Sequence, residues 1–66
     1  MPIVTINMLE GRKVEQKKEL IKRVTESISE TLDSPPERIR IIIREIKNED
    51  YGVGGLPVME YRSSSD

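Results

Sequence analysis

Few side chains in this sequence could carry chemistry, because it contains neither histidine nor cysteine. Pro2 directly follows the initiator methionine, so removal of Met1 would leave a secondary amine at the N-terminus. An α-amino group has an unperturbed pKa of about 7.7–8.0, and burial or nearby cations lower it. Pro2 is therefore a candidate general base, which works best when its pKa lies near neutral pH. The alternative is that Pro2 merely begins an edge strand.

Two arginines could bind an anion beside such an amine. Arg12 follows the first apolar segment, and Arg40 stands between isoleucines in the second. An arginine among apolar residues costs free energy unless it has an anionic partner, and its planar fork suits a carboxylate. The structural alternatives are an ion pair with a glutamate for Arg40 and a solvated loop for Arg12. If both lie near Pro2, they would bind an anionic substrate and lower the pKa of the amine.

The composition excludes several other kinds of site and partner. Without Cys or His the chain lacks disulfides and the usual soft-metal ligands, and no carboxylate spacing predicts a metal site. The GVGG run at residues 52–55 lacks the lysine and the following helix of a phosphate loop. The net charge of −1 predicts no nucleic-acid partner. No apolar run is long enough for a membrane span or a signal peptide, which favours a cytoplasmic protein.

Three segments must position these candidate residues. Residues 2–9 are rich in β-branched types and predict a strand, and residues 38–46 predict a second strand. Apolar positions spaced mostly by four predict a helix over residues 14–32, which Pro35 and Pro36 end. Because the order is strand, helix, strand, the two strands should be parallel, as in a β-α-β unit.

The glycines around Val53 predict a tight hairpin after the second strand. The returning strand would contain Val58, Met59 and Tyr61, and residues 62–66 would form a polar, frayed tail. The expected fold class is therefore α+β, within a single domain over residues 1–66. It comprises a two-stranded parallel sheet, one long helix and a C-terminal β-hairpin.

A sheet with one helix on one face needs a second cover. Parallel sheets normally bury both faces, and a chain of 66 residues is marginally stable alone. Because no disulfide or metal is available, partner subunits are the remaining support. We therefore expect oligomerisation to complete the fold, with the C-terminal hairpin reaching a neighbouring chain.

Taken in order, these motifs resemble the 4-oxalocrotonate tautomerase family, the small members of the tautomerase superfamily. The resemblance covers nearly the whole chain, from Pro2 to about Gly55. The matching features are the Met-Pro start, LEGR at 9–12, EQK at 15–17, Leu32 with Asp33 before the prolines, Arg40, and YGVGG at 51–55.

The resemblance implies a homohexamer of three dimers that tautomerises unsaturated 2-oxo acids without a cofactor or metal, in aromatic hydrocarbon catabolism. The substrate would be a small mono- or dicarboxylate, such as one like 2-hydroxymuconate. Pro2 would be the general base, and Arg40 of a neighbouring subunit would stabilise the developing dienolate oxygen and adjacent carboxylate. Arg12, also from a neighbour, would hold the distal carboxylate. The backbone around Leu9 would help bind the substrate, and Tyr51 would form a wall of the apolar pocket.

One position departs from the family pattern, and two other functions remain open. The wall position is most typically phenylalanine, and the hydroxyl of Tyr51 could admit water or hydrogen-bond the substrate. Relatives on this scaffold use the same proline for dehalogenation, hydration or decarboxylation, for which Glu49 or Asp50 could activate water. The other alternative is a non-catalytic assembly module with a vestigial site.

Overall fold

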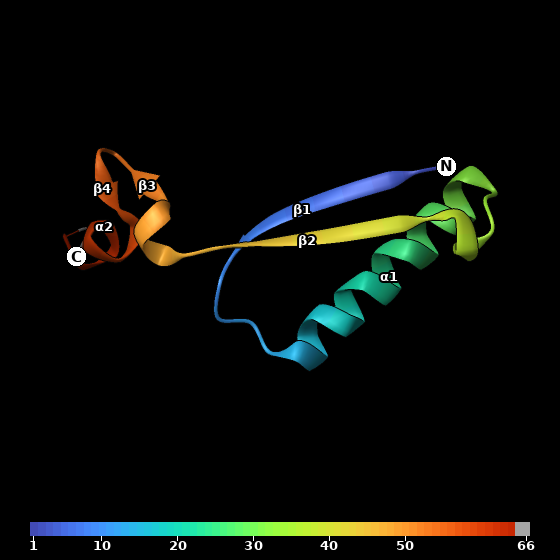
Figure 1. Cartoon of the computed structure of the whole chain (residues 1–66), viewed down its shortest axis with the longest axis horizontal. Helices are drawn as coiled ribbons and strands as arrows, with labels where there is room; N and C mark the ends of the chain where they lie inside the picture. Colours follow the sequence, from blue (N-terminus) through green and yellow to red (C-terminus); the bar gives the residue numbers. More distant parts are fainter. Residues whose placement is uncertain (65–66) are drawn as a thin grey trace.

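The N-terminal part of the chain forms a strand–helix–strand unit. In the computed structural model, which describes residues 1–64, strand β1 (Ile3–Leu9) leads into helix α1 (Val14–Leu32). A 3₁₀ turn, η1 (Pro36–Arg38), then leads into strand β2 (Arg40–Ile46). The two strands pair in parallel along their whole length, which confirms the predicted β-α-β unit (Figure 1).

Helix α1 has the predicted limits, and local hydrogen bonds explain both ends. No Ser, Thr, Asp or Asn caps its start, but Gln16 Oε1 accepts the backbone N–H of Lys13 at 3.0 Å. At its end Asp33 adopts the left-handed conformation (φ 53°), and Ser34 N–H donates to Ser29 O at 3.2 Å. This pattern satisfies helix carbonyls before the prolines prevent continuation.

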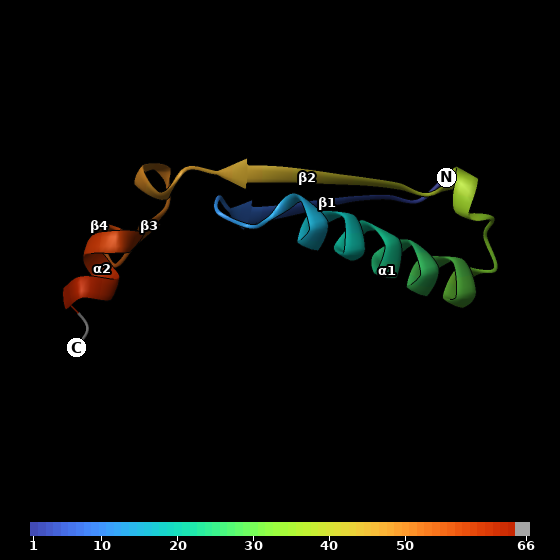
Figure 2. The same ribbon diagram turned by 90° about the horizontal axis from the view of Figure 1, so that it is seen from below.

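The sheet has one face covered by α1 and one uncovered face. Glu45 of β2 pairs with Lys17 of α1 at 3.2 Å, which marks the covered face. Its strand neighbours on that face are half-buried apolar residues: Val4, Ile6, Met8, Ile41 and Ile43. Among residues 1–64, no element lies on the opposite face (Figure 2), where Ile3 is 62% exposed and Ile42 is 44% exposed. A sheet with one uncovered face is therefore present, as predicted.

The C-terminal part forms an arm, defined here as residues 47–64, which extends beyond the ends of β1 and β2 (Figure 1). It contains a 3₁₀ turn, two very short strands and a helix: η2 (Asn48–Asp50), β3 (Gly52–Val53), β4 (Leu56–Pro57) and α2 (Val58–Ser64). The hairpin turns at Gly54 and Gly55, whose φ values are 60° and 91°. Two successive positive φ angles are typical of a type I′ turn, which suits glycine. The predicted hairpin is confirmed.

The returning strand is shorter than the sequence predicts. Leu56 and Pro57 pair with β3. Val58, Met59 and Tyr61, assigned to this strand from the sequence, instead lie in helix α2, so that prediction is wrong. The change occurs at Pro57, because proline cannot donate to a strand ladder but is well accommodated at the start of a helix.

Three other segment limits differ from the prediction. The first strand begins at Ile3 rather than at residue 2. The second strand begins at Arg40 rather than at residue 38, because residues 36–38 form η1 and Ile39 N–H donates to Pro36 O at 3.1 Å. Residues 62–64 of the predicted tail continue helix α2. The last two residues of that tail, 65 and 66, lie outside the described part of the chain.

The single chain is extended and buries little of its surface. Among residues 1–64, the buried apolar side chains are those of Ile39 and Val58. The accessible surface is 5388 Å², about 1,100 Å² more than a typical monomer of this size exposes. The radius of gyration is 15.6 Å, against about 11 Å for a compact chain of this length. A standard interface covers about 800 Å² of each partner, so the excess is enough for one.

Candidate active site

The candidate base, Pro2, lies beside Arg40 at the amino-terminal end of the sheet. Pro2 is half-buried, and its carbonyl oxygen accepts the backbone N–H of Arg40 at 3.0 Å. This bond extends the parallel ladder by one residue beyond Ile3. The main chain at Pro2 is therefore fixed to β2 by the same hydrogen bonding that forms the sheet.

The guanidinium of Arg40 is held by a neutral partner. Its Nη1 donates to the backbone carbonyl of Glu37 in η1 at 2.6 Å. Among residues 1–64 no ion pair of Arg40 with a carboxylate is present, so the predicted structural alternative, a salt bridge to a glutamate, is not formed. A carbonyl orients the guanidinium without neutralising it, and the positive charge can still attract an anion.

Leu9 and Arg12 lie at the opposite end of the sheet. Leu9 is the last residue of β1 and is half-buried. Gly11, with φ 118°, turns the chain between β1 and α1, and Arg12 follows it on the surface. We call residues 9–12 the LEGR loop. It places a backbone segment and a cation next to each other, as binding of a carboxylate requires.

The LEGR loop forms one wall of a cavity of about 560 Å³. The other walls come from the start of α1 and from the arm. The lining residues are Met8, Leu9, Glu10, Gly11, Arg12, Lys13, Gln16, Asn48, Met59 and Arg62. Arg12 and Lys13 bring two positive charges to the wall formed by the LEGR loop and the start of α1, against the single acidic Glu10, so this side of the cavity suits a small anion.

Tyr51 lies on the arm and does not line this cavity in the single chain. Its side chain is 42% exposed, and its carbonyl accepts the N–H of Val58 at 2.8 Å. Tyr51 N–H donates to Asn48 O at 3.3 Å, so the main chain at this position is fixed on both sides. The phenol is thus presented outward from a rigid turn.

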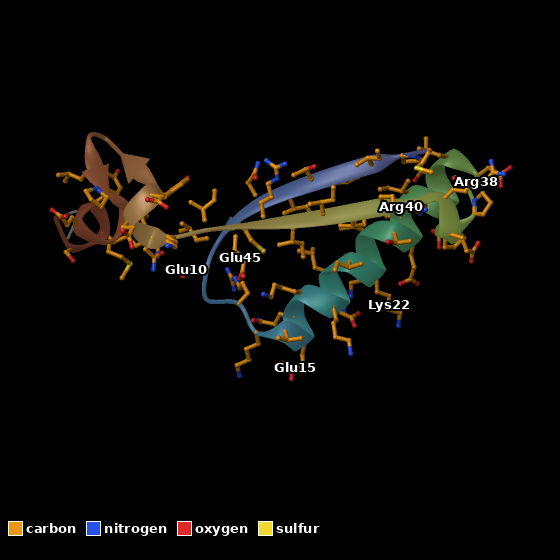
Figure 3. All side chains as sticks on the ribbon, in the orientation of Figure 1. Glu10, Glu15, Lys22, Arg38, Arg40 and Glu45 are labelled. Atoms are coloured by element: carbon orange, nitrogen blue, oxygen red, sulfur yellow. The ribbon has the colours of Figure 1, made fainter. Side chains whose placement is uncertain are left out.

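The five predicted site residues therefore fall into two groups. Pro2 and Arg40 lie at one end of the sheet, and Leu9 and Arg12 lie at the other, with Tyr51 farther out on the arm. Figure 3 shows Arg40 at its end of the sheet. The seven residues of β1 separate the groups by about 20 Å. One chain cannot bring them around one small substrate, so a common site requires at least two copies.

Sequence reasoning missed several residues that line the cavity. The position of Gln16 could have been predicted, because it lies three residues after Lys13, where a glutamine side chain can cap the start of the helix. Glu10 belongs to the LEGR motif, but its partner is Asn48, far along the chain. Met59 and Arg62 were assigned to a strand and to a tail, so their approach to the LEGR loop was not predictable.

The carboxyl of Glu19 has a shifted pKa, and it lies on α1, away from both groups. The hydrogen bond and the positive charge of Arg23 lower the pKa of Glu19, with a smaller contribution from Lys22. Arg23 Nε donates to Glu19 Oε2 at 2.7 Å on the exposed side of α1. The pair is one helical turn apart and stabilises the helix rather than a site.

Residues 1–64 contain no group of three or more His, Cys, Asp or Glu side chains placed to bind a metal ion. Within the same described residues, neither helix has the length and apolar character needed to cross a membrane.

A family of known proteins matches this chain almost from end to end. The family described as "Tautomerase enzyme" matches residues 2–61. The chain belongs to the tautomerase family. This makes it an isomerase, and its extended β-α-β chain with a C-terminal hairpin is the tautomerase fold.

Curated relatives of this tautomerase share about half of its residues. A probable tautomerase of Halalkalibacterium halodurans is 49% identical over 60 residues, which cover 91% of this chain and 98% of the relative. A 2-hydroxymuconate tautomerase of Pseudomonas putida is 49% identical over 57 residues, covering 86% of this chain and 90% of the relative.

Solved structures agree with the arrangement of this tautomerase, including its arm. TomN, a 4-oxalocrotonate tautomerase homologue in the tomaymycin biosynthetic pathway, has a TM-score of 0.92 at 35% identity, covering 98% of this chain and all of TomN. A heterohexameric 4-oxalocrotonate tautomerase from Chloroflexus aurantiacus has a TM-score of 0.84 at 37% identity, covering 91% and 97% of the two chains. The family therefore includes oligomers.

Proposed function

We propose that this tautomerase moves a proton within small enol or unsaturated 2-oxo acids, with the amino-terminal nitrogen of Pro2 as general base after removal of Met1. The main supporting observation is the position of Arg40. Its backbone is bonded to Pro2, and its guanidinium is oriented by a carbonyl that leaves the charge uncompensated. Each subunit thereby presents, at the edge of the sheet that carries its base, a cation that no carboxylate neutralises and that can act on an anion bound at a neighbouring subunit.

The proposed reaction needs no group from outside the protein and substrate. The neutral amine of Pro2 removes a proton from the substrate, negative charge develops on the dienolate oxygen, and the same nitrogen returns the proton to another carbon. Arg40 stabilises the developing charge and the adjacent carboxylate. Arg12 holds a distal carboxylate, the main chain at Leu9 binds the substrate, and Tyr51 closes the pocket.

Assembly brings the two groups of residues together in this proposal. We propose a homohexamer built as a trimer of dimers, in which one subunit provides Pro2 and neighbouring subunits provide Arg40, Arg12 and the arm. Support comes from the uncovered sheet face with its exposed Ile3 and Ile42, the extended arm and the heterohexameric relative. Sedimentation at micromolar concentration should show hexamers, and a well-folded monomer would contradict the proposal.

A turnover screen tests the proposed activity directly. The protein is first shown by intact mass to begin with Pro2, and then assayed with 2-hydroxymuconate and with phenylenolpyruvate. The first compound tests a dicarboxylate, which the names of the Pseudomonas relatives suggest, and the second tests a monocarboxylate. Turnover of at least one supports the proposal. A halo-acrylate in the same screen tests the dehalogenase alternative, which turnover of that compound alone would favour.

A further inference from the structure

Glu10 connects the LEGR loop to the base of the arm. Its backbone N–H donates to Ile46 O at 2.9 Å, one residue beyond the last strand pair. Its carboxylate Oε2 accepts the backbone N–H of Asn48 at 3.1 Å. The two bonds hold the chain on either side of Lys47, where it leaves the sheet to form the arm. Figure 3 shows Glu10 at this junction, at the end of the sheet opposite Arg40.

The junction matters because the arm packs mainly on itself. The principal contacts of α2 are with η2, β3 and β4, whereas those of α1 are with β2 and η1. The orientation of the arm relative to the sheet therefore depends strongly on the few bonds at its base. A hydrogen bond across Lys47 therefore affects the position of every residue farther along the arm.

The large cavity lies in the angle that this junction controls. Its walls include Arg12 from the LEGR loop and Met59 from the arm, with Glu10 and Asn48 between them. If the arm pivots about Lys47, the distance between these walls changes. The carboxylate of Glu10 therefore acts on the space next to Arg12 without itself needing to touch a substrate.

The carboxylate of Glu10 is a suitable acceptor for the backbone N–H of Asn48. Asn48 begins the 3₁₀ turn η2, so its N–H has no acceptor within the turn. An ionised carboxylate makes a stronger hydrogen bond to such a donor than a neutral group does. The interaction also turns the Glu10 carboxylate toward η2, so that it does not neutralise Arg12 two residues away.

We propose that Glu10 is a positioning residue that clamps the arm to the LEGR loop and thereby sets the binding of the distal carboxylate at Arg12. The inference rests on the proposed function for its kinetic consequence. The clamp acts at the end of the sheet away from Pro2 and Arg40. It should therefore affect substrate binding, measured as KM, and leave the proton transfer, measured as kcat, nearly unchanged.

Three substitutions separate the length of the side chain from its charge. Glu10→Gln keeps an acceptor at the same reach, Glu10→Asp keeps the charge on a shorter side chain, and Glu10→Ala removes both. For 2-hydroxymuconate, Glu10→Ala and Glu10→Asp should raise KM about tenfold with kcat within about twofold of wild type, as expected for loss of one hydrogen bond. Glu10→Gln should stay within about threefold in KM.

Glu26→Ala is the matched control, because Glu26 is an exposed acidic residue of α1 whose side chain has no hydrogen bond or ion pair described within residues 1–64. It should leave both constants unchanged. The proposal is overturned if Glu10→Ala behaves like Glu26→Ala. It is also overturned if Glu10→Asp restores KM and Glu10→Gln does not, because charge rather than reach would then be responsible.

Hydrogen exchange at the Asn48 amide provides a readout that does not depend on activity. Loss of its acceptor in Glu10→Ala should speed exchange about tenfold, and Glu10→Gln should restore protection. If the wild-type protein turned over neither substrate, the proposed function would fail while this measurement still tested the clamp. Unchanged exchange in Glu10→Ala would overturn the clamp whatever the activity.

Discussion

The two ends of the parallel sheet differ in how they hold their candidate residues. At the amino-terminal end, Pro2 and Arg40 are joined by a backbone hydrogen bond that continues the strand ladder. At the other end, Arg12 lies in a loop after Gly11, and Tyr51 lies on an arm attached through a short connector. The ladder therefore holds Pro2 and Arg40 directly. At the other end its last bond is that of Glu10 N–H to Ile46 O, and Arg12 and Tyr51 lie beyond it, where the side-chain bond of Glu10 to Asn48 links loop and arm.

This difference suggests that one end of the sheet serves the proton transfer and the other end serves substrate binding. Groups that act on the developing charge must be placed accurately, and a strand ladder provides that accuracy. Groups that only hold a distal carboxylate tolerate more movement, and they can lie on a loop. Substitutions of residues held in the ladder, at the end with Pro2, should therefore lower kcat, and substitutions of residues beyond the ladder, at the end with Arg12, should raise KM.

The largest effect should follow from blocking the amine at Pro2. Protein that retains Met1 has an amide at this nitrogen, with no basic lone pair, and should lose about 10²–10⁴ in kcat/KM, the usual contribution of a general base. Pro2→Ala leaves a primary amine and should lose less. Intact mass must establish the first residue of each preparation before kinetics are measured.

The pH dependence of kcat/KM gives a second test of Pro2 as the general base. Because the amine must be neutral, kcat/KM should rise with pH through a pKa below about 7.7–8.0, lowered by nearby arginines. If protein with retained Met1 turned over substrate as fast as processed protein, Pro2 would not be the base.

Substitution of Arg40 should give the next largest effect. Arg40→Ala removes a cation whose interaction strengthens as charge develops, so kcat should fall about 10²–10³-fold. Arg40→Lys keeps the charge but loses the planar fork and should recover only part of the rate. Steady-state kinetics on processed protein, with sedimentation to confirm assembly, measure the effect. A change confined to KM would place Arg40 with the binding residues instead.

Arg12→Ala should have a smaller and more selective effect. A distal carboxylate is held about equally in the ground and transition states, so KM for 2-hydroxymuconate should rise about tenfold or more and kcat should change little. Phenylenolpyruvate lacks the second carboxylate and should show little change, which makes it the control substrate. Equal losses on both substrates would remove the distinction between the two ends of the sheet.

The smallest effect should come from Glu19, which belongs to neither end. Arg23 lowers the pKa of this carboxyl from its ordinary value of 4.5. The folded state then binds protons less readily than the unfolded state, so the pair stabilises the fold above the unfolded pKa. This contribution is lost as the pH falls through the folded pKa.

Glu19→Gln should therefore slightly lower the thermal midpoint at pH 7 and leave it unchanged at about pH 3. The effect should be small because both side chains are largely exposed, and salt should weaken it further. Kinetic constants should match wild type, which separates helix stability from the site. A larger decrease in the thermal midpoint at pH 3 than at pH 7 would contradict the predicted direction of the pH dependence.

The sequence alone determined the β-α-β unit, because its signals are local. The apolar stripe of α1, the alternation in both strands and the glycines of the hairpin act over a few residues. The helix, the two strands and the hairpin turn that they predict are present. The candidate residues Pro2, Arg12 and Arg40 could be named for the same reason, since their chemistry is intrinsic to their type. Leu9 and Tyr51 could be named as candidate site residues only from the resemblance to the family.

Only the tertiary structure decided where these residues lie relative to one another. The register of the sheet, in which Ile3 pairs with Arg40, brings Arg40 beside Pro2 and away from Arg12, and no local pattern states that register. The bond from Glu10 to Asn48 spans 38 positions in the sequence, and the helix after Pro57 follows from where pairing with β3 stops. Such features depend on contacts between distant segments, whose free energy appears only once the chain has folded around them.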